Sequence, residues 1–341
     1  MINAKRRSIP LIWLVIATAG LLLAWATWEQ FQGDRAVLFG DLSNLSTILL
    51  GIFIEAAPFL LLGALISGVI EVFFSGQDFS RWIPHNPFLA ALCGALFGLV
   101  FPVCECGVVP FTRRLFRKGL PAPVGIAFVL GAPALNPIVI GSTLVAFGWG
   151  PVLWGRVGLT ILIATLTGFL FSFQKDSAQM LNAVTLDFIC DRPAPEGEPG
   201  EAQTLPGQLG RVLTIATGEF FEIGRYLVLG ATLAGVLQIF IPQSALLAIS
   251  RGPVISVFLL ILLAVLLSVC STVDAFIALS FAGSFTAGSI LAFLVYGPMV
   301  DIKSTLMFLH VFSRKTVIVM ILIPLLLTIL LTIFINLNMG L

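Results

Sequence analysis

The sequence has few charged residues. Asp, Glu, Lys and Arg make up 10% of its 341 residues, whereas a soluble domain carries about 25%. Hydrophobic residues make up 58%, which is enough for several membrane crossings, because one spanning helix needs about 20 apolar residues. The composition excludes a soluble enzyme, a coiled coil and a disordered scaffold. It predicts an all-α polytopic membrane protein with about seven to nine membrane segments.

Histidine, cysteine and net charge are also low. Two His residues cannot form a histidine metal cage, and 18 basic residues against 17 acidic ones do not favour nucleic acid as a partner. Five Cys residues, three of them in apolar stretches, do not indicate a secreted disulfide framework. The sequence lacks a Walker loop, a nucleophile elbow, a zinc-protease helix and a dinucleotide-binding glycine pattern. We therefore expect neither enzymatic activity nor a cofactor, and membrane lipid as the surrounding medium.

Charge and composition divide the chain into four parts. Residues 1–30 are expected to form a transmembrane helix with a cytoplasmic N-terminus, because basic residues precede the apolar run. Residues 45–173 form a first transmembrane repeat and residues 211–341 a second one. Residues 174–210 between them are rich in Pro, Gly and Glu, which predicts an acidic cytoplasmic linker.

The two repeats are related by sequence. Residues 55–74 align without gaps to residues 222–241 with eight identities in twenty positions, and Cys104 and Asn136 in the first repeat correspond to Cys270 and Asp301 in the second. An odd number of predicted crossings separates the starts of the two aligned helices. The repeats should therefore have inverted topology, as in many secondary transporters.

Each repeat contains helix breaks. Pro102, Gly107 and Pro110 oppose a continuous helix around Cys104, so residues 88–112 are expected to form a re-entrant hairpin. The segment GAPALNP (residues 131–137) interrupts the next helix. Broken helices of this kind commonly form the binding site of a transporter near the bilayer midplane.

Thiols and polar residues gather at these breaks. Thiolates are soft ligands, so Cys104, Cys106 and Cys270 are candidate ligands for a soft ion or metalloid, although no firm metal site follows. The alternative is that Cys serves as a small buried hydrophobe, which we prefer for Cys93. The candidate substrate-binding residues are Cys104, Glu105, Cys106, Asn136, Cys270, Ser271, Thr272 and Asp274.

Four ionisable residues in apolar stretches are candidates for coupling or proton relay: Glu55, Glu222, Asp301 and Lys303. Charged groups at membrane depth are costly and usually face a cavity or a partner. Asp301 should therefore either pair with Lys303 or take up a proton near neutral pH. The alternatives are a purely structural pair of Asp301 with Lys303, and carboxylates at positions 55 and 222 that brace the other repeat.

A family resemblance rests on the segments around these breaks. Residues 104–137, beginning CECGVVPF, and residues 270–281 (CSTVDAFIALSF) with 293–304 (FLVYGPMVDIKS) resemble the paired signatures of the predicted permease family that includes the ArsP organoarsenical efflux permeases. The resemblance implies a multi-pass permease of the bacterial inner membrane that exports trivalent arsenicals, with thiols at Cys104, Cys106 and Cys270. Where the usual pattern has Ser between the first two cysteines, this chain has Glu105.

The sequence thus favours a permease of the secondary-transporter type that exports a soft, thiol-reactive solute, such as a trivalent arsenical or metalloid, through a cysteine-lined site. Alternatives are a carrier of a small sulfur-containing or oxyanion solute, the membrane subunit of a larger assembly, and a thiol/disulfide relay. The partners expected besides the solute are a second copy of the chain in a homo-oligomer or a soluble thiol protein.

Overall fold

The structure is a computed structural model that describes residues 35–73, 83–84, 86–101, 103–173, 205–240 and 252–338. All regular elements within these ranges are helices, which confirms the predicted all-α class. Within the described residues, six helical segments of 23 to 33 residues are long and apolar enough to cross a membrane, and two shorter apolar helices accompany them. The predicted first span and nearly all of the predicted linker lie outside the described residues.

The helices of the first half begin with the longest helix of the described chain. A single short break separates α6 from α7, and a 3₁₀ turn follows α8. The bounds are α2 (Arg35–Phe73), α4 (Pro87–Val100), α5 (Glu105–Arg117), α6 (Ala122–Leu135), α7 (Pro137–Phe147), α8 (Pro151–Leu170) and η1 (Phe171–Phe173).

The second half follows the same order of helices. A long helix is followed by a short apolar helix, a short helix after a cysteine-bearing break, a broken pair and a final long helix. The bounds are α10 (Leu205–Phe240), α12 (Ile255–Leu267), α13 (Asp274–Phe281), α14 (Ala287–Met299), α15 (Ile302–Val311) and α16 (Arg314–Asn338).

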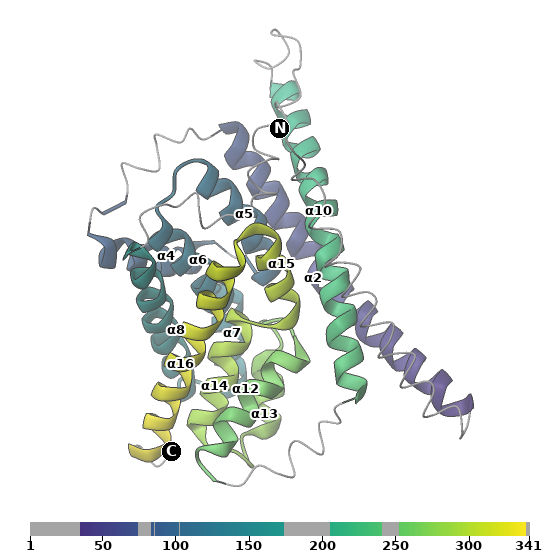
Figure 1. The fold of residues 1–341 in the computed structure, drawn as a ribbon, viewed down its shortest axis with the longest axis vertical. Coiled ribbons are helices and arrows are strands. Elements are labelled where there is room, and N and C mark those ends of the chain that lie inside the picture. Colours follow the sequence, from purple (N-terminus) through teal and green to yellow (C-terminus); the bar gives the residue numbers. More distant parts are fainter. Residues whose placement is uncertain are drawn as a thin grey trace, which may run out of the picture.

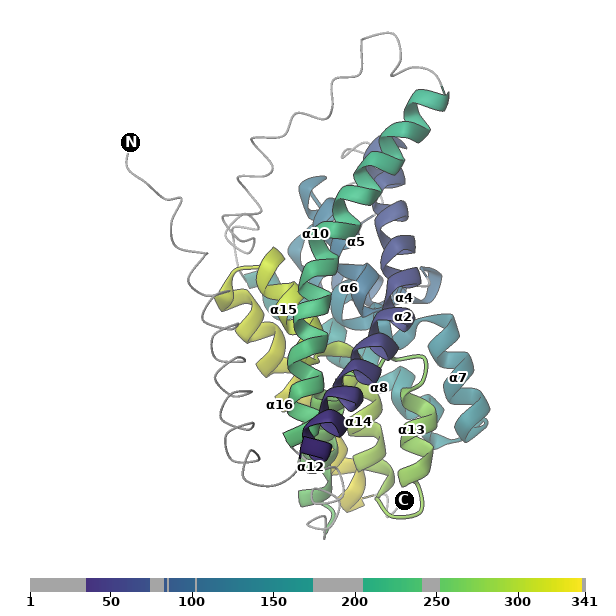
Figure 2. The ribbon, with the colours of Figure 1, turned by 90° about the vertical axis from the view of Figure 1, so that its right-hand side faces the viewer.

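The longest helices of the two halves, α2 and α10, pack together in opposite directions (Figures 1 and 2). Gly68 of α2 approaches the backbone of Val212 near the start of α10, and Gly235 near the end of α10 approaches Leu45 near the start of α2. Both glycines allow close helix packing, because a methyl group at either position would lie within 3 Å of the other helix. The antiparallel arrangement is the one that an inverted repeat requires.

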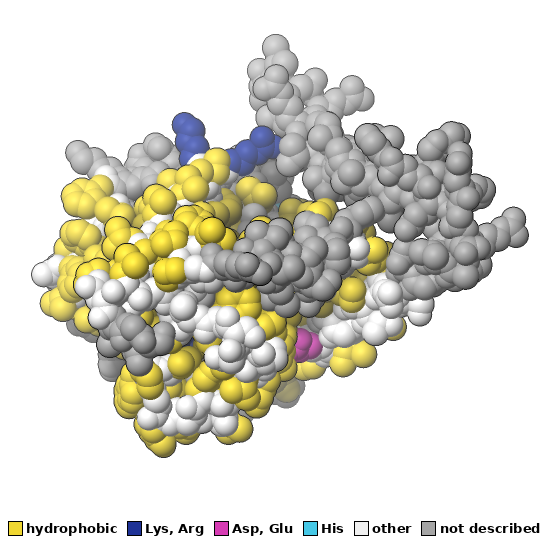
Figure 3. Space-filling model, turned by 90° about the horizontal axis from the view of Figure 1, so that it is seen from below, with side chains coloured by type: hydrophobic (Ala, Val, Ile, Leu, Met, Phe, Trp, Pro, Cys, Tyr) yellow, Lys and Arg dark blue, Asp and Glu magenta, His cyan; other side chains and the backbone are white. Residues whose placement is uncertain are grey.

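The centre of the molecule is formed by the broken helices. Every residue of α6 is buried, as are nearly all residues of α14. α6 packs between α4 and α8, and α14 packs between α12 and α16. The outer helices present apolar side chains, and the face seen in Figure 3 is largely hydrophobic or uncharged over its described part. The buried polar residues at the breaks of the central helices include Asn136, Asp301 and Lys303.

Short helices of the first half contact short helices of the second half at these breaks. α5 packs against α15, and α7 packs against α13. The equivalence of the halves is incomplete, however, because Gly63 of α2 contacts Gly107 of α5 whereas its counterpart Gly230 contacts Lys303 of α15. Thus α2 packs next to the cysteine-bearing break that precedes α5, whereas α10 packs next to the break between α14 and α15.

Candidate functional site

Two equivalent breaks carry the predicted thiols. In the first half, α4 ends at Val100 and α5 begins at Glu105, with Cys104 as the N-cap residue of α5. In the second half, α12 ends at Leu267 and α13 begins at Asp274, so that Cys270 lies in the connection. The predicted helix breaks are thus present in both halves, whereas a re-entrant path through a membrane stays a prediction.

The two breaks meet inside the protein. The Ser271 hydroxyl donates to Glu105 Oε2 at 3.5 Å, although 166 residues separate the two positions. Cys104, Cys106 and Cys270 are all buried and reduced, whereas Cys93 is only partly buried on α4. The structure therefore brings the predicted thiols into one region.

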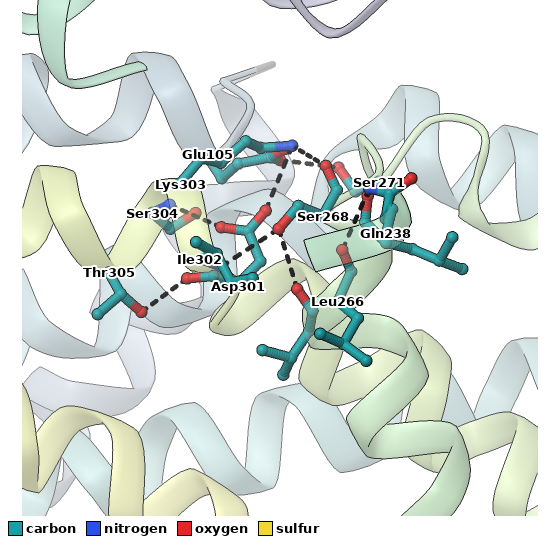
Figure 4. A network of polar contacts seen from close by, with 12 residues as sticks. Glu105, Gln238, Leu266, Ser268, Ser271, Asp301, Ile302, Lys303, Ser304 and Thr305 are labelled. Atoms are coloured by element: carbon teal, nitrogen blue, oxygen red, sulfur yellow. Dashed lines mark hydrogen bonds and ion pairs between the residues drawn. The ribbon is translucent and has the colours of Figure 1, made fainter. Parts of the chain in front are cut away.

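Lys303, near the start of α15, connects the two breaks (Figure 4). Its ammonium lies 3.0 Å from Glu105 Oε1 and 3.3 Å from Asp301 Oδ2, and it donates to the Ser268 carbonyl oxygen at 2.6 Å. Ser268 has a φ of +45°, a left-handed conformation that is uncommon for a residue other than glycine. The predicted pair of Asp301 with Lys303 is confirmed, and Glu105 is a third member that was not predicted as a partner of Lys303.

Asp301 and Asn136 occupy equivalent positions as helix caps. The Asp301 carboxylate accepts from the Ser304 amide at 2.6 Å at the start of α15, and the Asn136 side chain accepts from the Ile138 amide at 3.0 Å at the start of α7. Both satisfy backbone donors at a helix N-terminus. The correspondence of Asn136 with Asp301 that the sequence repeat predicted is therefore confirmed in the structure. Of these two caps, the one in the second half is charged.

Asp274 is held by an arginine from the other half. Arg156 of α8 donates to both oxygens of the Asp274 carboxylate, at 2.9 and 2.7 Å, and to the Thr143 hydroxyl of α7 at 2.9 Å. The Arg156 side chain is completely buried. Its guanidinium thus joins α7, α8 and α13, and the predicted role of Asp274 in substrate binding stays a prediction.

The two remaining glutamates have different surroundings. Glu55 of α2 accepts from the Thr272 hydroxyl at 3.2 Å, next to the second break. Glu222 of α10 instead lies 2.9 Å from both Arg113 of α5 and His310 of α15. Glu55 therefore lies close to the thiol region, whereas Glu222 bridges α5 and α15.

Further ion pairs surround the Glu222 contact. Arg114 pairs with Glu219 and lies 3.4 Å from Glu71, and Lys118 donates to the Ile70 carbonyl oxygen at 2.8 Å. Arg113, Arg114 and Lys118, at the C-terminal end of α5, are thus all in contact with α2 or α10.

Sequence reasoning missed several of these partners. Arg156 and His310 are single polar residues in apolar stretches, and a rule that treats every intramembrane ionisable group as functional would have selected both. Among the described residues, no group of three or more His, Cys, Asp or Glu side chains is arranged to hold a metal ion. The cluster of Cys104, Cys106 and Cys270 does not form such a ligand set in this conformation.

The long apolar helices and the buried charges at helix breaks define a polytopic membrane protein. The chain belongs to a family described as predicted permease, whose model matches residues 41–337, so that it is a membrane permease.

Three relatives are similar to it. "UPF0718 protein YcgR" of Bacillus subtilis (strain 168) is 44% identical over 82% of this chain and 92% of the relative. "Putative two-component membrane permease complex subunit" of Streptococcus mutans serotype c is 36% identical over 80% of this chain and 88% of the relative. "UPF0718 protein YraQ" of Escherichia coli (strain K12) is 20% identical over 56% of this chain and 57% of the relative. No solved structure matches the chain.

Proposed function

We propose that this permease exports a soft, thiol-reactive solute, a trivalent arsenical or metalloid, and binds it with Cys104, Cys106 and Cys270. The observation that carries the proposal is the contact between the two cysteine-bearing breaks through Ser271 and Glu105. Three buried thiols in one region of a permease suit a soft solute, because sulfur ligands select such solutes.

The chemistry at such a site is ligand exchange. Each thiol that binds replaces one hydroxyl group on the arsenic, so that one As–S bond forms, one As–O bond breaks, and the thiol proton leaves with the hydroxyl as water. Arsenite has three such hydroxyl groups, whereas an organoarsenical such as phenylarsonous acid has two and is held by two of the three thiols at a time. The reaction changes no oxidation state and therefore needs no oxidant or reductant. Since each As–S bond can be hydrolysed again, the solute can be released on the other side of the membrane.

The broken helices supply the movable parts of this proposal. Residues 45–173 and 211–341 act as two inverted repeats that expose the thiols alternately to the two sides of the membrane. The linker of residues 174–210 and the N-terminus lie in the cytoplasm of a bacterial cell. Glu55 and the pair of Asp301 with Lys303 lie beside the site and are candidates for coupling, whereas Glu222 lies at the contact of α5 with α15.

A second candidate function is that of a subunit within a larger permease complex. The observation that favours it is the printed name of the Streptococcus mutans relative, a putative subunit of a two-component membrane permease complex. In that case export would need a second membrane protein, and the purified chain alone would bind the solute without transporting it in proteoliposomes.

The test is arsenical resistance and accumulation in cells that lack other arsenical exporters. Cells that express the protein should accumulate less methyl- or phenylarsenite than cells without it. Cys104→Ser, Cys106→Ser and Cys270→Ser should each reduce this difference, whereas the matched control Cys93→Ser should retain it. Full activity of all three variants, with expression equal to that of the wild type, would contradict the proposal.

A further inference from the structure

The Lys303 ammonium is surrounded by oxygen atoms of the protein. It donates a hydrogen bond to the Ser268 carbonyl oxygen at 2.6 Å and forms ion pairs with Glu105 Oε1 at 3.0 Å and with Asp301 Oδ2 at 3.3 Å. The residue is 2% exposed. This buried cation is therefore already paired with two carboxylates of the protein and offers no free counter-charge to an anionic solute.

The same cluster has an excess of negative charge. Two carboxylates, Glu105 and Asp301, face one ammonium, and both are buried. Asp301 also caps α15 through the Ser304 amide at 2.6 Å, whereas the Ser271 hydroxyl lies 3.5 Å from Glu105 Oε2, and Glu105 Oε1 accepts no hydrogen bond from the described residues. Glu105 lies directly between Cys104 and Cys106 in the chain. Of these two carboxylates, the one beside Cys104 and Cys106 thus has the weaker hydrogen bond.

We propose that Glu105 is a specificity-determining residue that makes the cysteine site accept neutral or cationic thiol-reactive solutes and reject anionic ones. The proposal rests on the function proposed above and names the charge class of its substrate. Like charges repel strongly in a buried site, since the effective dielectric constant there is far below that of water. An anionic group on a solute bound to Cys104 or Cys106 would meet the Glu105 carboxylate, and the Lys303 ammonium beside it is already paired with two carboxylates.

The experiment compares three probes that share one thiol-reactive group and differ in charge. They are phenylarsonous acid, which is neutral, its para-carboxylate, which is anionic, and its para-aminomethyl derivative, which is cationic. Binding to the purified full-length protein in detergent is measured by titration calorimetry, with the Cys104→Ser/Cys106→Ser/Cys270→Ser variant as the background. The wild-type protein should bind the carboxylate at least tenfold more weakly than the neutral probe, and the cationic probe should bind more tightly than the carboxylate.

Variants identify the responsible group. Glu105→Gln should reduce the ratio of the dissociation constants of the anionic and the neutral probe at least fivefold. The control is Glu71→Gln, because Glu71 lies at the far end of α2 and faces Arg114 and Lys118. This variant should leave the ratio unchanged. Asp301→Asn is a second test if Glu105→Gln does not fold. It removes one of the two negative charges beside Lys303, and asparagine keeps the helix cap, as Asn136 does in the first half. It should therefore also reduce the ratio of the dissociation constants of the anionic and the neutral probe.

Two results would overturn the charge-selection proposal and leave the thiol site intact. The first is equal affinity of the wild-type protein for all three probes. The second is equally weak binding of both charged probes that Glu105→Gln does not change, because the cost of desolvating a charge of either sign would then explain the weak binding. Binding of the neutral probe that persists in the triple cysteine variant would instead overturn the thiol site itself.

Discussion

Removing the carboxylate of Asp274 should destabilise the protein by about 3–5 kcal/mol, the usual cost of leaving a buried charge without its partner. The Arg156 and Asp274 side chains are 0% and 5% exposed and share two hydrogen bonds of 2.9 and 2.7 Å. In Asp274→Asn the guanidinium keeps only a neutral partner and the Thr143 hydroxyl. Water cannot replace the lost contact at a position this deeply buried.

A double-mutant cycle measures this effect. The variants are Asp274→Leu, Arg156→Met and the two combined, and the assay is unfolding of the purified protein in mixed detergent micelles. Each single change should cost about 3–5 kcal/mol, and the double variant should recover much of that loss, because two apolar side chains of similar size replace the pair.

The matched control is Glu71→Gln. The Glu71 side chain is 33% exposed and lies 3.4 Å from Arg114, so the loss of its charge should cost less than about 1 kcal/mol. If Asp274→Asn costs no more than this control, or if the losses of the two single variants simply add in the double variant, the reasoning is refuted.

Two further predictions concern helix packing and the contacts of Lys303. Gly63→Ala would place a methyl group 2.5 Å from the Gly107 Cα atom and should cost about 1–3 kcal/mol. The control on the same helix is Gly51→Ala, whose methyl group would meet no atom within 4 Å and which should be neutral or stabilising by up to about 1 kcal/mol. Equal thermal stability of the two variants would contradict the close packing at Gly63. Asp301→Asn keeps the helix cap, as Asn136 does in the first half, so its stability should be nearly normal, whereas Lys303→Met leaves two buried carboxylates unpaired and should cost about 3–5 kcal/mol. A loss of stability in Asp301→Asn as large as that in Lys303→Met would contradict the capping role.

The sequence could predict the helix breaks because their signals are local. Proline and glycine interrupt a helix within a few residues of their own position, and so do the capping residues Asn136 and Asp301. The sequence repeat shows such breaks at equivalent positions in both halves. The opposite directions of α2 and α10 followed from counting the crossings between them. These features need no knowledge of which helices lie next to one another.

The partners of the buried charges could not be predicted in this way. Asp301 was matched with Lys303 because the two are adjacent in sequence, but Glu105 reaches the same ammonium from the other half of the chain. Arg156 and Asp274 are separated by 118 residues. Pairs of this kind depend on how α5 packs against α15 and α7 against α13, and hydrophobic patterns do not encode which helices are neighbours.

The proximity of the thiols in the two breaks is the central claim, and one crosslinking measurement tests it most directly. A variant that keeps only Cys104 and Cys270, with Cys93, Cys106 and Cys190 replaced by Ser and a protease site inserted after residue 198, is treated in membranes with a short dithiol-specific reagent and then cleaved. The two halves should stay joined on a denaturing gel, and prior addition of phenylarsonous acid should prevent the crosslink. The matched variant that keeps only Cys93 and Cys270 should separate into halves. Separation of the Cys104 and Cys270 variant under every condition would contradict a shared thiol site.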